Sequence, residues 1–178
     1  MITKKEEEII QGIAMVLAAE NPTYITSFDD VVEELEEKYR ISTDAGAYRL
    51  AFILDNVVVK MSKDKSRNRK LVAEAKFIQK MREDEKYGRH FPETELFKVG
   101  DVTLQIQEKV NMSHDSVSYD DMDEVIKLGI ELGIEDIHSN NYGWKIGPNG
   151  LYPVFVDVDF RHKTAPPRRN RRRSWFVR

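Results

Sequence analysis

The sequence predicts an α+β fold in which helical patterns come first and paired strand patterns fill the middle of the chain. Apolar residues recur at helical spacing over residues 4–20 and 27–40. The spacing then changes, and residues 47–61 and 95–110 each contain two β-rich runs on either side of a short turn. With 178 residues, the chain is long enough to bury a hydrophobic core.

Composition excludes several classes of protein. The chain has no cysteine, which rules out disulfides and thiolate metal sites and suits a reducing cytoplasm. The four histidines lie far apart in the sequence, so a zinc site is not expected. No apolar run approaches the ~20 residues that cross a bilayer, and the acidic residues 6–8 do not resemble a signal peptide. We therefore expect a cytoplasmic protein without a membrane partner.

The net charge of −3 conceals an asymmetry. Residues 161–178 carry eight Lys and Arg and no acid, which leaves a charge of −11 on residues 1–160. Residues 163–178 are expected to form a basic tail that is disordered when isolated. Its Arg run and Trp175-Phe176 could bind nucleic acid through residues 166–178, or they could dock on an acidic protein surface.

Two predicted helices form the N-terminal segment, residues 1–41, which we expect to pack on the core. The first covers residues 4–20 and ends at Asn21-Pro22. The second runs from Ser27, as its N-cap, to about Arg40. Its cluster of glutamates is interpreted as a solvent-facing side.

A β-rich part follows over residues 42–110. Residues 47–54 and 57–61 flank Asp55-Asn56, a typical hairpin turn, and Lys60 ends the second strand. A helix that contains Glu74 is predicted from Asn68 to Met81. A second strand pair, residues 95–99 and 102–110, surrounds Gly100-Asp101.

Residues 111–162 begin with a polar linker. An amphipathic helix is then predicted from Asp121 to Leu132, closed by Gly133. We expect four of its side chains to point inward: Met122, Val125, Ile126 and Ile130. Beyond it, residues 142–146 and 151–156 bracket Gly147–Gly150 and predict a further hairpin.

The chemistry-bearing residues flank this last hairpin. Asp136 is followed five residues later by Asn141, and the apolar run 154–156 leads directly to Asp157, with Asp159 two residues further on. A carboxylate can orient or deprotonate a hydroxyl, whereas amide and carboxylate oxygens can hold Mg²⁺ against phosphate groups. This spacing is common by chance, so its weight depends on the upstream residues.

Taken in order, these features resemble the protein-kinase-like fold. The first half of the order is a hairpin with Lys60 at a strand end, a helix with Glu74 and a second strand pair. A further helix, the D-x4-N loop from Asp136 to Asn141, a hairpin and Asp157 follow. Over residues 42–160 the resemblance extends to the short kinase-like proteins of tailed bacteriophages, whose loop typically reads D-L-H-x-G-N. It implies a small β-rich N-lobe, residues 42–110. Only 18 residues follow Phe160, so it also implies a strongly reduced helical C-lobe, residues 111–162.

The resemblance implies a site for ATP and Mg²⁺. Lys60 would contact the α- and β-phosphates and pair with Glu74, and Asp136 would be the catalytic aspartate. Asn141 and Asp157 would be the metal ligands, with Asp159 as the alternative to Asp157.

The same resemblance implies where the nucleotide would lie. Gly46 and the three residues that follow it, Ala47-Tyr48-Arg49, resemble a glycine-containing phosphate loop, in which Gly46 and Tyr48 would contact the nucleotide. The backbone of Glu108 and Val110 corresponds to a hinge that would meet the adenine edge. The chain departs from the pattern at several positions: the loop has one glycine, Ile134 replaces a common His, Asn140 replaces the Gly before Asn141, and no Gly follows Phe160.

Three functions are compatible with these observations. The first is an ATP–Mg²⁺-dependent phosphotransferase with a Ser/Thr-type acceptor, phage-encoded and acting on a host or phage protein in the host cytoplasm. The second is an inactive pseudokinase-like protein that acts by protein–protein contact. The third is a nucleic-acid-associated protein that acts through its tail. The complete set of Lys60, Asp136, Asn141 and Asp157 favours the first function, and the reduced C-lobe favours the second.

Overall fold

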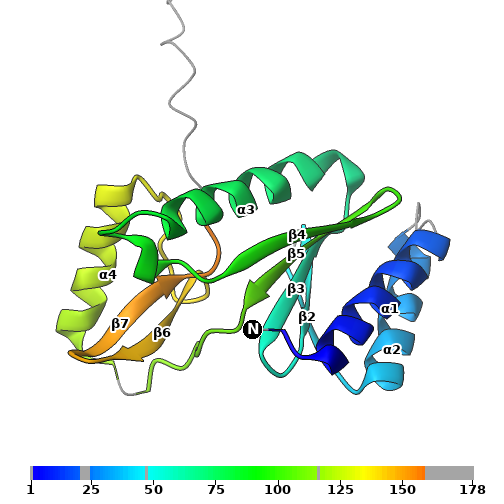
Figure 1. The fold of residues 1–178 in the computed structure, drawn as a ribbon, viewed down its shortest axis with the longest axis horizontal. Coiled ribbons are helices and arrows are strands. Elements are labelled where there is room, and N and C mark those ends of the chain that lie inside the picture. The colour runs from blue at the N-terminus through cyan, green and yellow to red at the C-terminus, as the bar shows by residue number, and fades with distance from the viewer. Residues whose placement is uncertain (1, 21–24, 47, 116, 159–178) are drawn as a thin grey trace, which may run out of the picture.

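The computed structural model describes residues 2–20, 25–46, 48–115 and 117–158. This part of the chain contains a five-stranded antiparallel sheet, a two-stranded sheet and four α-helices (Figure 1). The helices are α1 (Lys4–Glu20), α2 (Ile25–Tyr39), α3 (Asn68–Arg82) and α4 (Tyr119–Leu132). The strands are β1 (Ser42–Ala45), β2 (Arg49–Ile53), β3 (Val57–Ser62), β4 (Thr94–Val99), β5 (Val102–Glu108), β6 (Tyr142–Gly147) and β7 (Gly150–Phe155). The predicted α+β class is confirmed.

The larger sheet has the strand order β1-β2-β3-β5-β4. The β2–β3 hairpin turns at Asp55-Asn56 as predicted, with Ile53 opposite Val58. The β4–β5 pair closes at Gly100-Asp101, also as predicted. Strand β1 was not predicted, because its four residues lack the alternation of apolar and polar side chains that marks a half-buried strand.

Side-chain alternation gives the sheet two chemically different faces. One face is apolar and packs against α1 and α2; its fully or nearly fully buried residues are Leu50, Phe52, Val57, Val59, Leu104 and Ile106. The opposite face carries polar side chains that are also buried: Lys60, Gln105 and Gln107. Helix α3 lies across this second face (Figure 1). Buried polar groups need partners, so this is where a polar site can form.

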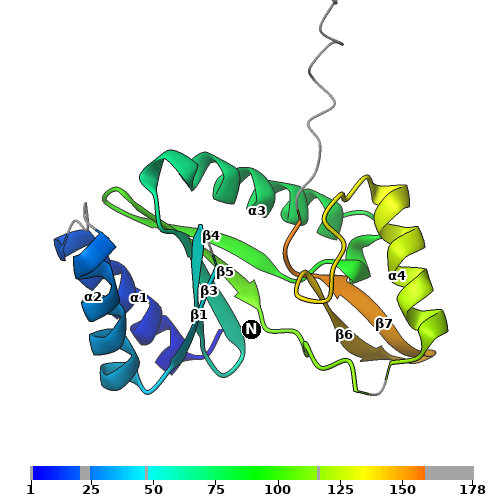
Figure 2. The ribbon, with the colours of Figure 1, turned by 180° about the vertical axis from the view of Figure 1, so that it is seen from behind.

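The N-terminal helices lie on the far side of the sheet from α3, as both views show (Figures 1 and 2). Helix α1 has the predicted bounds, whereas α2 begins at Ile25, two residues before the predicted N-cap Ser27. The predicted stop at residues 21–22 lies outside the described residues. No helix of the described ranges has the length and apolar character that a membrane span requires.

Glu6 fixes the start of α1 to the sheet. Its buried carboxylate accepts hydrogen bonds from the N–H and hydroxyl of Thr3, at 2.9 and 2.8 Å, and from the N–H of Asn56, at 2.7 Å. Burial alone would raise the pKa of Glu6, but these hydrogen bonds lower it to about 2. The helix is therefore tied to the turn of the β2–β3 hairpin by a charged group.

A second core joins α3, α4 and the β6–β7 hairpin. It includes Ile78, Phe91, Val125, Ile134, Trp144 and Phe155. Helix α4 starts two residues before the predicted Asp121, because Ser118 and Asp121 form a capping box. It ends at Gly133, whose φ of 73° is the left-handed conformation expected of a helix-terminating glycine.

The predicted inward face of α4 is wrong in part. Val125 is fully buried, but Ile126 is 48% exposed and Ile130 is 69% exposed. The helix is rotated so that Gly129 faces the core, where an added Cβ would lie 2.3 Å from the Ile137 side chain. Gly129 and Val125 therefore form the packed stripe, and the two isoleucines lie beside it.

The predicted linker packs along β6. Trp144 donates its backbone N–H to the carbonyl of Asn111 at 2.8 Å, and its indole N–H to Nδ1 of His114 at 3.0 Å. A Cβ at Gly143 would lie 2.5 Å from the Asn111 carbonyl oxygen. Only glycine allows this close approach of the two segments.

Candidate functional site

A cavity of about 550 Å³ opens between α3, the start of β2 and the loop that follows α4. Its volume is in the range of small-molecule sites. The predicted site residues that line it are Gly46, Tyr48, Glu74, Asp136, Asn141 and Asp157. These residues come from segments far apart in the sequence, and the fold brings them together.

Other predicted site residues do not line this cavity. Lys60 directs its Nζ to the carbonyl oxygen of Val156, at 2.5 Å, and is 9% exposed. The backbone N–H of Glu108, expected to be available as a hinge, donates to the carbonyl of Glu93 at 2.8 Å, and its carboxylate pairs with Lys145. Val110 is buried in the core.

Two further predictions fall outside the described residues. Asp159, the alternative metal ligand, is one of them. The basic tail, residues 163–178, is the other. Asp157 is thus the acid after β7 whose surroundings the structure describes.

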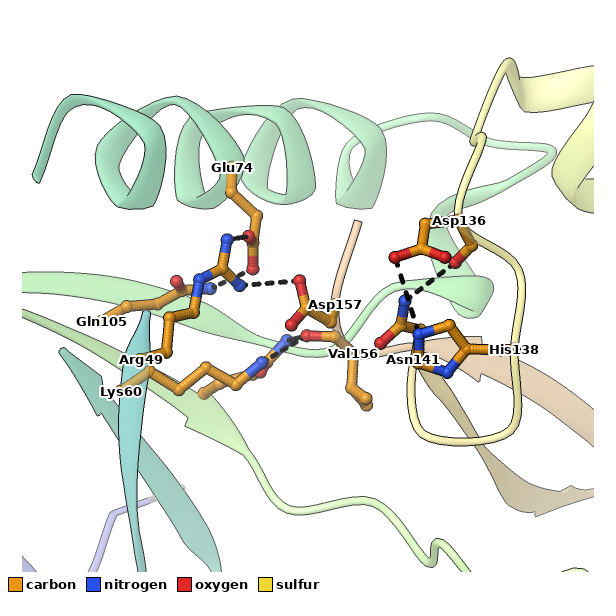
Figure 3. Close-up of polar contacts among 10 residues, drawn as sticks. Arg49, Lys60, Glu74, Gln105, Asp136, His138, Asn141, Val156 and Asp157 are labelled. Carbon is orange, nitrogen blue, oxygen red and sulfur yellow. Dashed lines mark hydrogen bonds and ion pairs between the residues drawn. The ribbon is translucent and has the colours of Figure 1, made fainter. Parts of the chain in front are cut away.

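Arg49 is the cation that contacts Glu74, a role predicted for Lys60. Its Nη2 pairs with the Glu74 carboxylate, and its Nη1 lies 2.6 Å from Oδ1 of Asp157 (Figure 3). Arg49 and Lys60 share one face of the sheet, because Lys60 lies opposite Ala51 and Arg49 is two residues before Ala51. Arg49, and not Lys60, therefore makes the direct contact with Glu74, and both cations lie on the same face of the sheet.

Burial controls the charges of this cluster. Burial raises the pKa of Glu74 to about 7, against the opposing effects of the Lys60 and Arg49 cations. Burial also lowers the pKa of Lys60, although the nearby Glu74 and Asp157 carboxylates act in the opposite direction. Both pKa shifts arise because a buried charge is poorly solvated, which favours the neutral form of each group. Burial thus disfavours the charged forms of both Glu74 and Lys60.

Gln105 is another polar contact of the buried carboxylate. Its Nε2 donates to Oε1 of Glu74 at 3.5 Å, and the whole residue is inaccessible to solvent. Its Oε1 has no hydrogen-bond partner among the described residues. Glu74 thus accepts a hydrogen bond from the Gln105 amide at Oε1, and its Oε2 lies in ion-pair contact with the Arg49 guanidinium.

The loop from Asp136 to Asn141 is held by its own main chain. The Asn141 side chain donates to the carbonyl of Asp136 at 2.8 Å, and its N–H donates to the carbonyl of His138 at 2.8 Å. The carbonyl of Asn141 accepts the N–H groups of Val156 and Asp157, at 2.9 and 3.2 Å. These bonds hold the loop directly beside the segment that carries Asp157.

Asp136 is the exposed acid of the site. Its side chain is 60% exposed, and Nε2 of His138 lies 3.5 Å from its Oδ2 (Figure 3). His138 also accepts the N–H of Asn140 at Nδ1, at 3.3 Å. His138 therefore braces the loop and leaves Asp136 accessible from the cavity.

Basic side chains line the part of the cavity near the start of α3. Arg67 and Lys70 both border it. The guanidinium of Arg67 stacks on the Tyr48 ring, 3.4 Å from its centroid. One cavity thus combines carboxylates with cations, an arrangement that suits a phosphate ligand accompanied by a metal ion.

The donor set is compatible with Mg²⁺ only in combination with a ligand. Across the described ranges, no group of three or more His, Asp or Glu side chains is arranged to hold a metal ion. Mg²⁺ usually takes one or two carboxylates and completes its shell with waters and substrate phosphates. Asp157 and the amide of Asn141, which line the same cavity, provide oxygens for such a site.

Sequence reasoning placed Arg49 in the glycine-containing loop but missed its contact with Glu74, and it missed Arg67 and Lys70 altogether. The hairpin register was the signal for Arg49, since a turn at residues 55–56 places it on the face of Lys60. Arg67 and Lys70 gave no signal, because basic residues at a helix start are common on protein surfaces.

Comparisons with protein-family models, curated proteins and solved structures gave no match for this chain. The site must therefore be interpreted from its own geometry.

Proposed function

We propose that this protein is an ATP–Mg²⁺-dependent phosphotransferase of the protein-kinase-like type, with a Ser/Thr-type hydroxyl as acceptor. The supporting observation is the convergence of Gly46, Tyr48, Glu74, Asp136, Asn141 and Asp157 on one cavity. The order of elements also agrees with that resemblance: the β2–β3 hairpin, α3 with Glu74, β4–β5, α4, the Asp136 loop, β6–β7 and Asp157.

The residues divide into two groups by chemistry. Asp157 and Asn141 would hold Mg²⁺, which would neutralise charge on the phosphates. Arg67 and Lys70 border the same cavity and can attract the phosphate groups. Phosphoryl transfer depends mainly on positioning and charge stabilisation, so these groups need only be correctly placed.

Asp136 is suited to orient the acceptor. Its carboxylate is exposed to the cavity, whereas Glu74 is only 2% exposed and cannot reach an incoming hydroxyl. The Asn141 side chain, which donates to the carbonyl of Asp136, and the main-chain bonds of Asn141 hold this loop before any substrate binds. A pre-positioned carboxylate of this kind can accept the proton of a hydroxyl during transfer.

The test is Mg·ATP-dependent transfer of labelled phosphate by the purified protein, to itself and to a cytoplasmic lysate. Asp136→Asn should lower transfer by about 10²-fold or more. Asp55→Asn is the matched control, because this exposed aspartate lies in the β2–β3 turn, away from the cavity. Transfer that persists undiminished in Asp136→Asn would contradict this role for the residue.

A catalytically inactive, pseudokinase-like binding protein is the second candidate. Two contacts favour it: Lys60 is buried against Val156, and the Glu108 N–H is already bonded to Glu93. In that case Mg·ATP would raise the melting temperature without any transfer of phosphate, and the protein would act through contact with a host or phage partner.

The basic tail supplies the third candidate activity. If residues 166–178 bind nucleic acid, their deletion should abolish retention on a DNA or RNA column at low salt. Retention that survives the deletion would remove the reason for proposing this activity.

A further inference from the structure

We propose that Arg49, not Lys60, binds the phosphate groups of the ligand, and that Asp157 holds the same guanidinium nitrogen in the ligand-free protein. This role of Arg49 rests on the proposed function, because it requires a phosphate-bearing ligand in the cavity. It differs from the role that the resemblance assigns to Lys60.

The first reason is that Arg49 connects two acids of unequal accessibility. Glu74 is 2% exposed, whereas the Asp157 side chain is 37% exposed and that of Arg49 is 28% exposed. Asp157 is therefore the more accessible of the two acids, and a ligand in the cavity can replace it at Arg49 more readily than it can replace Glu74. Figure 3 shows the Arg49 guanidinium between the two acids. The buried Glu74 anchors the guanidinium, while Nη1 can exchange Asp157 for a phosphate oxygen.

The two contacts also differ in the free energy that their loss would cost, and the more exposed Arg49–Asp157 contact is the cheaper one to break. A partly exposed ion pair contributes little to stability, so another anion can replace Asp157 at modest cost. Removal of one partner from a buried pair leaves an uncompensated charge and is much more costly. The Arg49–Glu74 contact should therefore persist while Nη1 changes its partner from Asp157 to a phosphate oxygen.

Lys60 is less suited to this role. Its Nζ is already 2.5 Å from the carbonyl of Val156, and Gln107 donates to the same oxygen at 3.0 Å. Lys60 does not line the cavity, whereas Arg49 does. Lys60 connects β3 to the segment after β7, and movement into the cavity would break that contact.

The chemistry of the guanidinium fits the ligand. Arginine presents paired N–H donors that match the oxygens of a phosphate, and it stays charged under all working conditions. Arg67 and Lys70 border the same cavity and add positive charge around the position where a phosphate chain would lie. The site is therefore expected to bind Mg·pyrophosphate as well as Mg·ATP, because the recognised group is the phosphate chain.

The test measures binding of Mg·ATP and Mg·pyrophosphate by isothermal titration calorimetry to three variants. Arg49→Gln should weaken both affinities by roughly ten- to hundred-fold, since it removes a charge-assisted hydrogen bond to each ligand. Lys60→Met should change both affinities by less than about threefold, because Gln107 still donates to the Val156 carbonyl and holds the segment that carries Asp157. Arg69→Gln, an exposed arginine of α3 that does not line the cavity, is the matched charge control.

Arg49→Gln also leaves Glu74 buried without its cation and could unfold the protein. The double variant Arg49→Gln/Glu74→Gln removes both charges and should fold, while it still binds both ligands as weakly as the single variant. A double variant with wild-type affinity would overturn the proposal.

The outcomes separate this inference from the proposed function. If wild-type protein binds the ligands and only Lys60→Met abolishes binding, Lys60 is the phosphate contact and the inference fails, while the function stands. If the wild type binds neither Mg·ATP nor Mg·pyrophosphate, the proposed function fails and this role of Arg49 fails with it. Loss in Arg49→Gln with retention in Lys60→Met and Arg69→Gln would support the inference.

Discussion

The ammonium of Lys60 lies 2.5 Å from the carbonyl oxygen of Val156. This contact joins the centre of the larger sheet to the residue immediately before Asp157. Gln107, from the neighbouring strand β5, donates to the same oxygen. Two side chains of the sheet, Lys60 and Gln107, thus hold the segment that leads into Asp157.

The first prediction concerns Asp157. Asp157→Ala should abolish the dependence of ATP binding on Mg²⁺, because it removes the carboxylate that would hold the metal. Titration calorimetry with and without Mg²⁺ measures this dependence. Asp159→Ala is the companion variant, and it should retain the Mg²⁺ dependence. The opposite pattern would assign the metal to Asp159.

The second prediction concerns Glu74 and pH. Its folded-state pKa of about 7 lies above the ordinary value of 4.5, so the folded protein binds this proton more tightly than the unfolded chain. The associated stabilisation is complete below about pH 4.5 and is lost as the pH rises through 7. Between pH 5 and 8 the wild type should lose about 3 kcal/mol relative to Glu74→Gln.

Urea unfolding at several pH values measures this difference. Glu85→Gln is the control, because Glu85 is an exposed residue of the turn that follows α3. It should show the pH profile of the wild type. A Glu74→Gln profile parallel to that of the wild type would mean that Glu74 does not titrate in this range.

The third prediction concerns Glu6 and acid. Its folded-state pKa of about 2 lies below 4.5, so its stabilisation is present above about pH 4.5 and is lost as the pH falls through 2. At pH 7, Glu6→Gln should lower the free energy of unfolding by about 2 kcal/mol, since charged hydrogen bonds to Thr3 and Asn56 become neutral or are lost. At pH 2.5 the difference should shrink. Glu8→Gln, at an exposed position of α1, should have no comparable effect.

Much of the fold could be predicted, because its elements carry strong local patterns. Helices α1 and α3 and the β2–β3, β4–β5 and β6–β7 pairs lie within a few residues of their predicted bounds. Each combines a clear apolar period with a turn or a stop of suitable composition. Strand β1 lacked such a pattern, since it depends on pairing with β2 and not on its own composition.

The site was harder to predict than the fold. Acids at the ends of elements were visible in the sequence, and several of them do line one cavity. The partner of Glu74 was not visible, because it depends on how far Arg49 and Lys60 reach across the same face of the sheet. Ile126 and Ile130 show the same limit, since their exposure depends on the rotation of α4 against Gly129 and Ile137.

The carbonyl group of Asn141 has a consequence for mutational analysis of this site. The oxygen of Asn141 accepts the N–H groups of Val156 and Asp157, so two main-chain bonds join the Asp136 loop to the Asp157 segment. Replacement of the side chain of Asp136 or Asp157 leaves these two main-chain hydrogen bonds in place. Single and double substitutions at Asp136 and Asp157 should therefore form a clean thermodynamic cycle, in which any non-additivity reports the ligand that the two carboxylates share.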